Sequence, residues 1–165
     1  MAALEAGASA PDFTVAGMNG DKFSLAEARK KGPVVAAFFK ISCPVCQYAF
    51  PYLERIFQAY SKSAVTVVGV SQNEKKDTAG FAREYGITFP LLLDDTHSYP
   101  ASNAYGLTNV PSIFLISPGG KVELSSVGWS KREIEDLNAR LAKAAGTAPA
   151  QIFKPDEQVD EFKPG

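Results

Sequence analysis

The chain has 165 residues, of which 45% are hydrophobic and 21% are charged. This length and composition are enough for one domain with a substantial core. Seventeen basic and 18 acidic residues give a net charge of -1. Because neither a basic patch nor an acidic block interrupts the chain, nucleic acid and an anionic membrane surface are excluded as expected partners.

The N-terminal residues carry neither the basic segment nor the apolar core of a signal peptide, and no stretch has the length of a membrane span. The given chain therefore favours a cytoplasmic location, with an exported mature form left open. The sequence holds two cysteines. In a reducing compartment such a pair is more typical of a catalytic thiol site than of a structural cross-link.

The first predicted elements lead directly to these cysteines. Residues 10–25 combine apolar positions with a Gly-containing turn at 17–21, which predicts a β-hairpin at the edge of the fold. Val34–Phe39 is a continuous apolar run of strand length, the pattern of a strand buried on both faces. It ends just before Cys43, and open α/β sheets build their sites at that end of a strand.

The tetrapeptide Cys43-Pro44-Val45-Cys46 opens the next predicted helix. Cysteines three apart at a helix start face each other and can close a small disulfide ring. With Cys43 as the N-cap, Pro44 takes the first helical position, where a missing N–H costs nothing. The free amides of Val45 and Cys46 and the helix dipole then favour the thiolate of Cys43. We expect Cys43 to be the nucleophile and the deeper Cys46 to be the resolving thiol.

The middle of the chain continues the alternation of strands and helices. The helix after Cys43 carries an apolar stripe expected to face the core, made of Val45, Ala49, Leu53, Phe57 and Tyr60. Val65–Val70 predicts a second buried strand, and a helix from about Asp77 ends at Gly86. Phe89–Leu93 predicts a short strand, and Pro100–Tyr105 a short helix.

A hairpin and a helix close the predicted domain. Ser112–Ile116 and Lys121–Val127 are joined by a Ser-Pro-Gly-Gly turn and predict antiparallel strands. The last helix begins at Ser130, whose partner Glu133 completes a capping box. The pattern predicts an α/β domain over residues 1–145.

Residues 146–165 lack this periodicity and predict an extended, Pro-containing tail that is partly disordered. The triplet Phe-Lys-Pro occurs twice in the tail, at residues 153–155 and 162–164. Phe153 and Phe162 are candidates to pin the tail to the domain surface or to a neighbouring subunit.

Three alternatives to thiol chemistry are open at the cysteine pair. A purely structural disulfide is disfavoured, because a cross-link between near neighbours removes little entropy from the unfolded chain. A structural zinc site needs four ligands, and the single histidine, His97, is the remaining soft ligand. Two inert, reduced cysteines are the third alternative. We therefore expect no metal and no cofactor other than the redox-active cysteine pair.

Several further motifs along the chain match the pattern of one group of proteins. They are Ala10–Thr14, the turn at 19–21, Phe38–Cys46, Phe50-Pro51 and Tyr105–Phe114. In these motifs the chain resembles thioredoxin-fold proteins of the TlpA-like and redoxin group, which is related to the AhpC/TSA antioxidant proteins, over roughly residues 7–145. The resemblance implies a thioredoxin-like fold, with a central mixed β-sheet, helices on both faces and an N-terminal β-hairpin extension.

The resemblance also implies that Pro111 is cis and lies beside the cysteines. Without it, an ordinary trans loop proline is the default. Pro111 opens a predicted strand at its first residue, where a missing donor is tolerated. The backbone N–H and C=O of Val110 would then hold an extended substrate segment by strand-like pairing.

The chain departs from the family at two positions that often hold an acidic residue, which are Ala37 and Ala49 here. A carboxylate at either position would carry the proton of Cys46. Water, another side chain or a slower route must serve instead.

Two residues before the motif also differ. Ser42 stands where tryptophan is common, which leaves the first sulfur less shielded. Lys40 supports the Cys43 thiolate if its ammonium lies within about 4 to 6 Å. The alternative, which we favour, is a solvated lysine at the strand end.

Peroxiredoxins resemble this group but require the pattern Pro-x-x-x-Thr-x-x-Cys. With Cys43 in the cysteine position, Ala36 and Lys40 stand at the proline and threonine positions. With Cys46 there, those positions hold Phe39 and Cys43. Neither frame fits, so peroxide reduction is the second hypothesis.

The sequence therefore predicts a thiol-disulfide oxidoreductase that exchanges disulfides with a protein dithiol or disulfide partner or with a small thiol. Cys43 attacks, Cys46 resolves, and Val110 and Pro111 guide the partner. A redox-sensing or protein-binding module with little turnover is a further alternative. A disulfide exchange assay with Cys43→Ser as the control separates these hypotheses.

Overall fold

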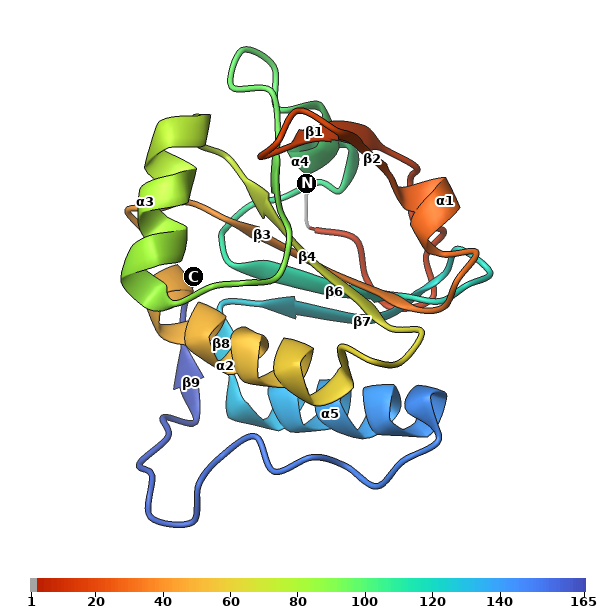
Figure 1. The fold of residues 1–165 in the computed structure, drawn as a ribbon, viewed down its shortest axis with the longest axis vertical. Helices are drawn as coiled ribbons and strands as arrows, with labels where there is room; N and C mark the ends of the chain where they lie inside the picture. Colours follow the sequence, from red (N-terminus) through yellow and green to blue (C-terminus); the bar gives the residue numbers. More distant parts are fainter. Residues whose placement is uncertain (1–2) are drawn as a thin grey trace.

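The centre of the fold is β3 (Val34–Phe39), the continuous apolar run of the sequence, whose six side chains are all buried. The computed structural model describes residues 3–165 and places β3 inside a seven-stranded sheet of order β2-β1-β5-β4-β3-β6-β7 (Figure 1). Its neighbour β4 (Thr66–Ser71) is parallel, and its neighbour β6 (Ser112–Ile116) is antiparallel. The prediction of a mixed sheet is confirmed. Residues 1–2 of the predicted 1–145 domain lie outside the described residues.

The remaining strands of the sheet extend it on both sides. On one side β5 (Leu91–Leu93) is parallel to β4 and antiparallel to β1 (Thr14–Gly17). The hairpin partner of β1 is β2 (Lys22–Ser24), which confirms the predicted N-terminal hairpin. On the other side β7 (Val122–Val127) pairs with β6, as the second predicted hairpin requires.

Helices cover both faces of the sheet because β3 is apolar on both sides. Val35, Ala37 and Phe39 face one cluster of buried side chains, to which α2, α3 and α5 contribute. The alternate side chains of β3 face a second cluster, to which α1 and α4 contribute. The bounds are α1 (Leu25–Ala28), α2 (Pro44–Tyr60), α3 (Lys75–Tyr85), α4 (Pro100–Ala104) and α5 (Lys131–Ala145). Within residues 3–165 no helix is long and apolar enough to cross a membrane.

Two helix starts differ in detail from the prediction. The helix α3 begins at Lys75 rather than about Asp77. At α5 the hydroxyl of Ser130 accepts from the N–H of Glu133 at 3.2 Å, as an N-cap should. The Glu133 carboxylate, however, accepts from Ser126 at 2.9 Å. The predicted capping box is therefore only half formed, because the Glu133 carboxylate bonds to Ser126 of β7.

The apolar stripe of α2 is only partly the one predicted. Ala49, Leu53 and Tyr60 are buried, whereas Val45 and Phe57 are half-buried. Further side chains on other sides of α2 are also buried, namely Cys46, Phe50, Tyr52 and Ile56. The helix is buried over more than one stripe because α3, α5 and the C-terminal tail all pack against it.

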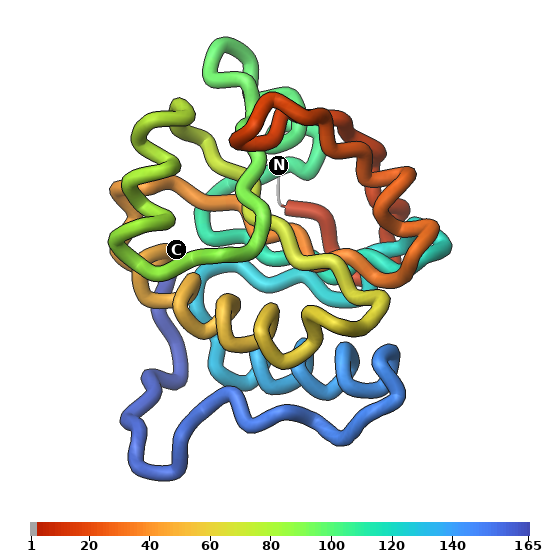
Figure 2. Tube along the Cα trace, in the orientation of Figure 1, coloured from red at the N-terminus to blue at the C-terminus, as the bar shows by residue number. Residues whose placement is uncertain are grey.

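The tail, residues 146–165, is extended and lies along α5 and the start of α2 (Figure 2). It ends in β9 (Phe162–Lys163), which pairs antiparallel with β8 (Trp129–Ser130). Phe153 lies against the rings of Tyr52 and Trp129 and therefore pins the tail to the domain. Phe162 does not, since its side chain is 62% exposed.

Candidate active site

The two cysteines lie where β3 passes into α2. Cys43 is the N-cap of α2, with the extended backbone angles φ -84° and ψ 114°, and Pro44 is the first helical residue. The carbonyl of Cys43 accepts the first helical hydrogen bond, from Gln47 N–H at 3.0 Å. The predicted position of the motif at the helix start is confirmed.

The two sulfurs have different surroundings. The side chain of Cys43 is half-buried, and its sulfur accepts a hydrogen bond from the backbone N–H of Cys46 at 3.2 Å. The side chain of Cys46 has 0% exposure. Both residues are free thiols in the structure. A partner disulfide can therefore reach Cys43 from solvent, whereas Cys46 can be reached only from Cys43.

Burial raises the pKa of the Cys46 thiol well above its ordinary value, and the neighbouring Cys43 sulfur raises it further. A backbone hydrogen bond from Lys40 acts in the opposite direction but is weaker. Cys46 therefore stays protonated at neutral pH. The accessibility of Cys43 suits it to a first step with a partner, and the burial of Cys46 suits that thiol to a second step.

The loop before β6 completes the surroundings of Cys43. The peptide bond between Val110 and Pro111 is cis, in agreement with the expectation drawn from the resemblance. The Cys43 thiol donates to the carbonyl of Val110 at 3.4 Å. The carbonyl of Pro111 accepts from Gly128 N–H at 2.8 Å, and Ser112 Oγ donates to the carbonyl of Asn109 at 2.7 Å. Val110 is thus held beside the reactive sulfur by bonds on both sides.

The supporting residues that were predicted lie around the motif with different degrees of exposure. Pro44 is exposed, and Val45 is half-buried against the main core. Lys40 is exposed, and within residues 3–165 its ammonium makes no hydrogen bond to Cys43. The arrangement is that of a solvated lysine at the end of β3. Ala37 and Ala49 are both fully buried, so no carboxylate lies at these positions.

Two amide side chains near the motif were not predicted. Gln47 Nε2 donates to the carbonyl of Ile41 at 2.9 Å, and Asn73 Oδ1 accepts from the N–H of Ile41 at 2.9 Å. Together they fix both polar groups of the residue two positions before Cys43. The position of Gln47 one turn after the N-cap was a usable signal. The sequence held no signal for Asn73, because this residue reaches the site only through the pairing of β3 with β4.

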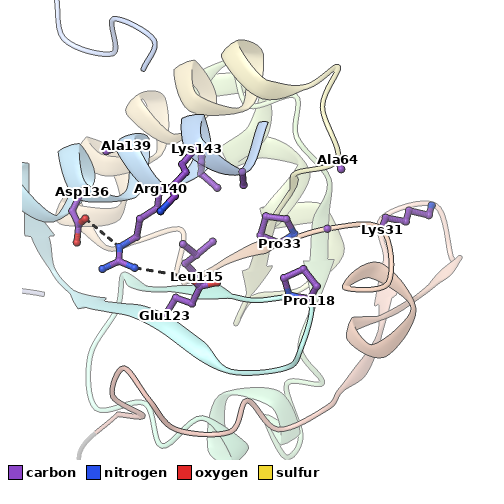
Figure 3. Close-up of a pocket in the computed structure, with 13 residues that line it drawn as sticks. Lys31, Pro33, Ala64, Leu115, Pro118, Glu123, Asp136, Ala139, Arg140 and Lys143 are labelled. Atoms are coloured by element: carbon purple, nitrogen blue, oxygen red, sulfur yellow. Dashed lines mark hydrogen bonds and ion pairs between the residues drawn. The ribbon is translucent and has the colours of Figure 1, made fainter. Parts of the chain in front are cut away.

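A large hollow on the described surface lies away from the cysteines. It has a volume of about 890 Å³ and is lined by residues that precede β3 or belong to α5 and β6, among them Pro33, Ala64, Leu115 and Arg140 (Figure 3). Arg140 contacts Asp136 at 3.1 Å and Glu123 at 3.9 Å at its rim. The cysteine motif is therefore a surface site and not an enclosed pocket.

A mixed sheet of this topology, with a C-x-x-C motif at the start of α2 and a cis-proline beside it, defines a thiol-disulfide oxidoreductase of the thioredoxin fold. The model of the AhpC/TSA family matches residues 6–125. The chain belongs to this family.

The relatives are consistent with this class. The chain is 33% identical over 132 residues to the thiol-disulfide oxidoreductase ResA of Geobacillus thermodenitrificans, covering 79% of this chain and 74% of that protein. It is 32% identical over 120 residues to the ResA of Bacillus subtilis, covering 72% of this chain and 65% of that protein. A candidate thiol:disulfide interchange protein DsbE from Chlorobium tepidum superposes with a TM-score of 0.76 at 27% identity, over 87% of this chain and 99% of that chain.

The predicted cytoplasmic location is wrong. The ResA and DsbE-like proteins that the chain matches are extracytoplasmic thioredoxins. The prediction rested on the composition of the N-terminal residues and on the presence of two cysteines. A thioredoxin-fold domain needs the same core and the same cysteine pair on either side of a membrane, so its composition does not carry this information.

Proposed function

We propose that this protein exchanges thiols and disulfides with protein partners through Cys43 and Cys46. The observation that carries the proposal is the unequal placement of the two sulfurs. The sulfur of Cys43 is half-buried and accepts a hydrogen bond from the N–H of Cys46 at 3.2 Å, while the Cys46 side chain is fully buried behind it. One sulfur is thus positioned for a partner and the other for the first sulfur.

The first step joins the protein to its partner. The Cys43 thiolate attacks one sulfur of the partner disulfide, so that a bond forms between Cys43 and this sulfur while the partner's S–S bond breaks. The other partner sulfur leaves as a thiolate. The N–H of Cys46 stabilises the negative charge on Cys43 before the attack.

The second step releases the partner. The Cys46 thiol loses its proton and attacks the Cys43 sulfur, which forms the Cys43–Cys46 disulfide and breaks the mixed disulfide. The second partner sulfur leaves and is protonated. The partner has then gained two electrons and two protons, and the cysteine pair has lost them. The same steps in reverse oxidise a partner dithiol.

The proton of Cys46 requires an acceptor, because burial raises the pKa of this thiol. Ala37 and Ala49 offer no carboxylate to accept it. The partner thiolate released in the first step is a base that the reaction itself supplies. We assign it this role, with water carrying the proton from Cys46 to that sulfur.

Val110 is positioned to guide the partner. Its carbonyl accepts from the Cys43 thiol at 3.4 Å, and this bond is lost when Cys43 ionises. The carbonyl is then available to an N–H of an extended partner segment. Such strand-like pairing holds a substrate through its backbone and tolerates many side chains. Peroxide reduction has less support, because neither cysteine has the proline and threonine that peroxiredoxins place before theirs.

The proposal is tested with variants that stop the reaction after its first step. Cys46→Ser is expected to form a stable mixed disulfide with a disulfide-bonded peptide, and mass spectrometry should place the adduct on Cys43. Cys43→Ser should react far more slowly, since Cys46 is buried. Equal rates of adduct formation by the two variants would refute the assigned roles.

A further inference from the structure

The last five residues of the chain, residues 161–165, form a short strap beside the cysteine site. In this strap Phe162 and Lys163 pair with Ser130 and Trp129. The N–H of Lys131 donates to the carbonyl of Glu161 at 2.9 Å. The strap thus runs antiparallel to the chain that leads from β7 into α5. Figure 1 shows β9 rising beside the start of α2.

Beyond β9 the strap reaches the loop that flanks Cys43. The carbonyl of Gly165 accepts from Asn109 Nδ2 at 3.1 Å. The approach is close, because a Cβ atom placed on Gly165 would lie 2.8 Å from the carbonyl oxygen of Val110. Gly128, at φ +77°, has no room for a side chain either, since a Cβ there would lie 2.5 Å from the Lys163 carbonyl oxygen. The end of the strap therefore lies across Gly128 and Val110.

Of these two backbone positions, Val110 borders the reactive sulfur, and Gly128 bonds to the cis-proline that follows Val110. Val110 accepts from the Cys43 thiol, and Gly128 donates to the carbonyl of Pro111. An extended partner segment that pairs with Val110 and continues away from Cys43 would meet residues 164–165. A folded protein partner needs a wider approach to Cys43 than a small disulfide does, so the strap obstructs the two to different degrees.

We propose that residues 161–165 determine which partners reach Cys43: they obstruct folded protein disulfides until they are displaced and leave small disulfides unhindered. This inference rests on the proposed exchange reaction at Cys43. The half-buried Cys43 sulfur stays reachable with the strap in place, which is what a small disulfide needs.

The contacts of the tail are stronger before residue 161 than after it. Arg55 holds Glu157 through two hydrogen bonds of 2.7 and 2.8 Å. The indole N–H of Trp129 donates to the carbonyl of Asp160 at 2.6 Å, and the N–H of Asp160 donates to Tyr48 at 3.0 Å. These contacts fix the segment up to Asp160.

The strap itself has fewer and more exposed contacts. Its strand is two residues long, and its largest side chain, Phe162, is 62% exposed. Lys163 contacts the Asp160 carboxylate at 2.9 Å and lies over the Tyr48 ring at 5.0 Å. An exposed ion pair of this kind contributes little to stability. The strap can therefore be displaced from a hinge after Asp160 while the rest of the tail remains docked.

The test compares two substrates with a chain that ends at Asp160. The reduced shortened protein and the full chain are each mixed with a small aromatic disulfide and with disulfide-bonded insulin, and the rates of thiol transfer are measured. We expect insulin to react faster with the shortened chain by roughly tenfold, which corresponds to about 1.4 kcal/mol. The rate with the small disulfide should be unchanged. Asp156→Ala, at an exposed position in the fixed segment, is the matched control.

A second variant keeps the chain at full length. Lys163→Pro removes the backbone N–H at a ladder position of β9, together with the contacts of the ammonium. A gain confined to insulin in this variant supports the proposal even if the shortened chain does not fold. An unchanged ratio of the two rates, or an equal change in both, overturns it. Loss of reaction with the small disulfide after Cys43→Ser shows separately that the exchange reaction itself occurs at Cys43.

Discussion

The two ends of β3 differ in shape and in chemistry. Its C-terminal end leads to Cys43, a half-buried sulfur on the surface, bordered by the backbone of Val110. Its N-terminal end begins after Pro33, which lines the hollow of about 890 Å³ (Figure 3). Six strand residues separate the two ends, roughly 20 Å at about 3.3 Å per residue.

The hollow lacks the sulfurs that the proposed reaction requires, because both cysteines lie at the other end of β3. Thiol-disulfide exchange needs an exposed sulfur, a donor that stabilises its thiolate and a second sulfur behind it. All three are present at the C-terminal end of β3. The other end has the hollow, where Arg140 contacts both Asp136 and Glu123, and Lys31 and Lys143 also line it. A hollow suits a small ligand, whereas a sulfur at the surface suits a macromolecular partner.

The largest expected effect is on disulfide exchange activity, which should depend on the cysteine end of β3 and not on the hollow at its other end. Cys43→Ser should reduce disulfide exchange to the uncatalysed rate, because no other described thiol is accessible. Ala139→Trp, which fills the mouth of the hollow from an exposed position, should leave exchange unchanged. Both rates are measured with the same peptide disulfide. A loss of activity in the Ala139 variant would mean that the hollow takes part in the reaction.

The second effect concerns stability at high pH. The pKa of Cys46 is raised from 9.0 in the folded protein. Its contribution to stability is therefore complete below pH 9 and is lost as the pH rises further, because the unfolded chain releases the proton first. The free energy of unfolding of the reduced protein should fall by about 1.4 kcal/mol per pH unit above pH 9 through this group alone.

Denaturant unfolding of the reduced protein and of Cys46→Ala between pH 8 and pH 11 measures this contribution. The variant should lack this component of the decline. The same slope in both proteins would mean that the burial of Cys46 does not govern the alkaline transition.

The third effect is local and concerns the tail. Arg55 bonds to the carbonyl of Ile152 at 2.8 Å as well as to the Glu157 carboxylate. Arg55→Ala should therefore loosen the tail and speed chymotryptic cleavage after Phe153, which is half-buried in the docked tail, several-fold. Arg140→Ala, at the opposite end of β3, removes an ion pair without touching the tail and should leave this cleavage unchanged. Equal cleavage rates in the two variants would contradict the role of Arg55.

The smallest effect should appear in acid. The Arg55 guanidinium lowers the pKa of Glu157 from 4.5 to about 2. The contribution of this pair is complete above pH 4.5 and is lost as the pH falls through about 2. The fluorescence of Trp129, the only tryptophan, reports on the docked tail because its indole bonds to Asp160. The spectrum should be constant down to pH 4.5 and shift below it, and Glu157→Gln should already be shifted at neutral pH. A Glu157→Gln spectrum identical to that of the native chain would exclude this coupling.

Local signals predicted much of the fold. Both ends of Val34–Phe39 were predicted correctly, because a continuous apolar run bounded by a proline and a lysine has few alternatives. The start of α3 was placed too late because its N-cap, Glu74, makes no side-chain hydrogen bond to the helix and leaves no capping signal in the sequence. The ends of helices and strands were predicted correctly where a particular residue type marks them.

The site was predicted where its parts are adjacent in sequence. Cys43 and Pro44 follow rules for the first turn of a helix, and Pro111 came from the family resemblance. The tail was predicted to be extended and partly disordered, with Phe153 and Phe162 as candidates to pin it. The ion pair that holds it was not predicted, because Arg55 and Glu157 are 102 residues apart and either could be a solvated charge. Only the folded chain brings such pairs together.

The proposed exchange reaction depends most on whether the two sulfurs of the motif form a reversible bond with each other. The most direct measurement is peptide mass spectrometry on the native protein after mild oxidation and again after treatment with a dithiol. We expect one disulfide, between Cys43 and Cys46 of the same chain, that the dithiol reduces completely. Persistent free thiols, or bonds formed only between separate chains, would contradict the proposed chemistry.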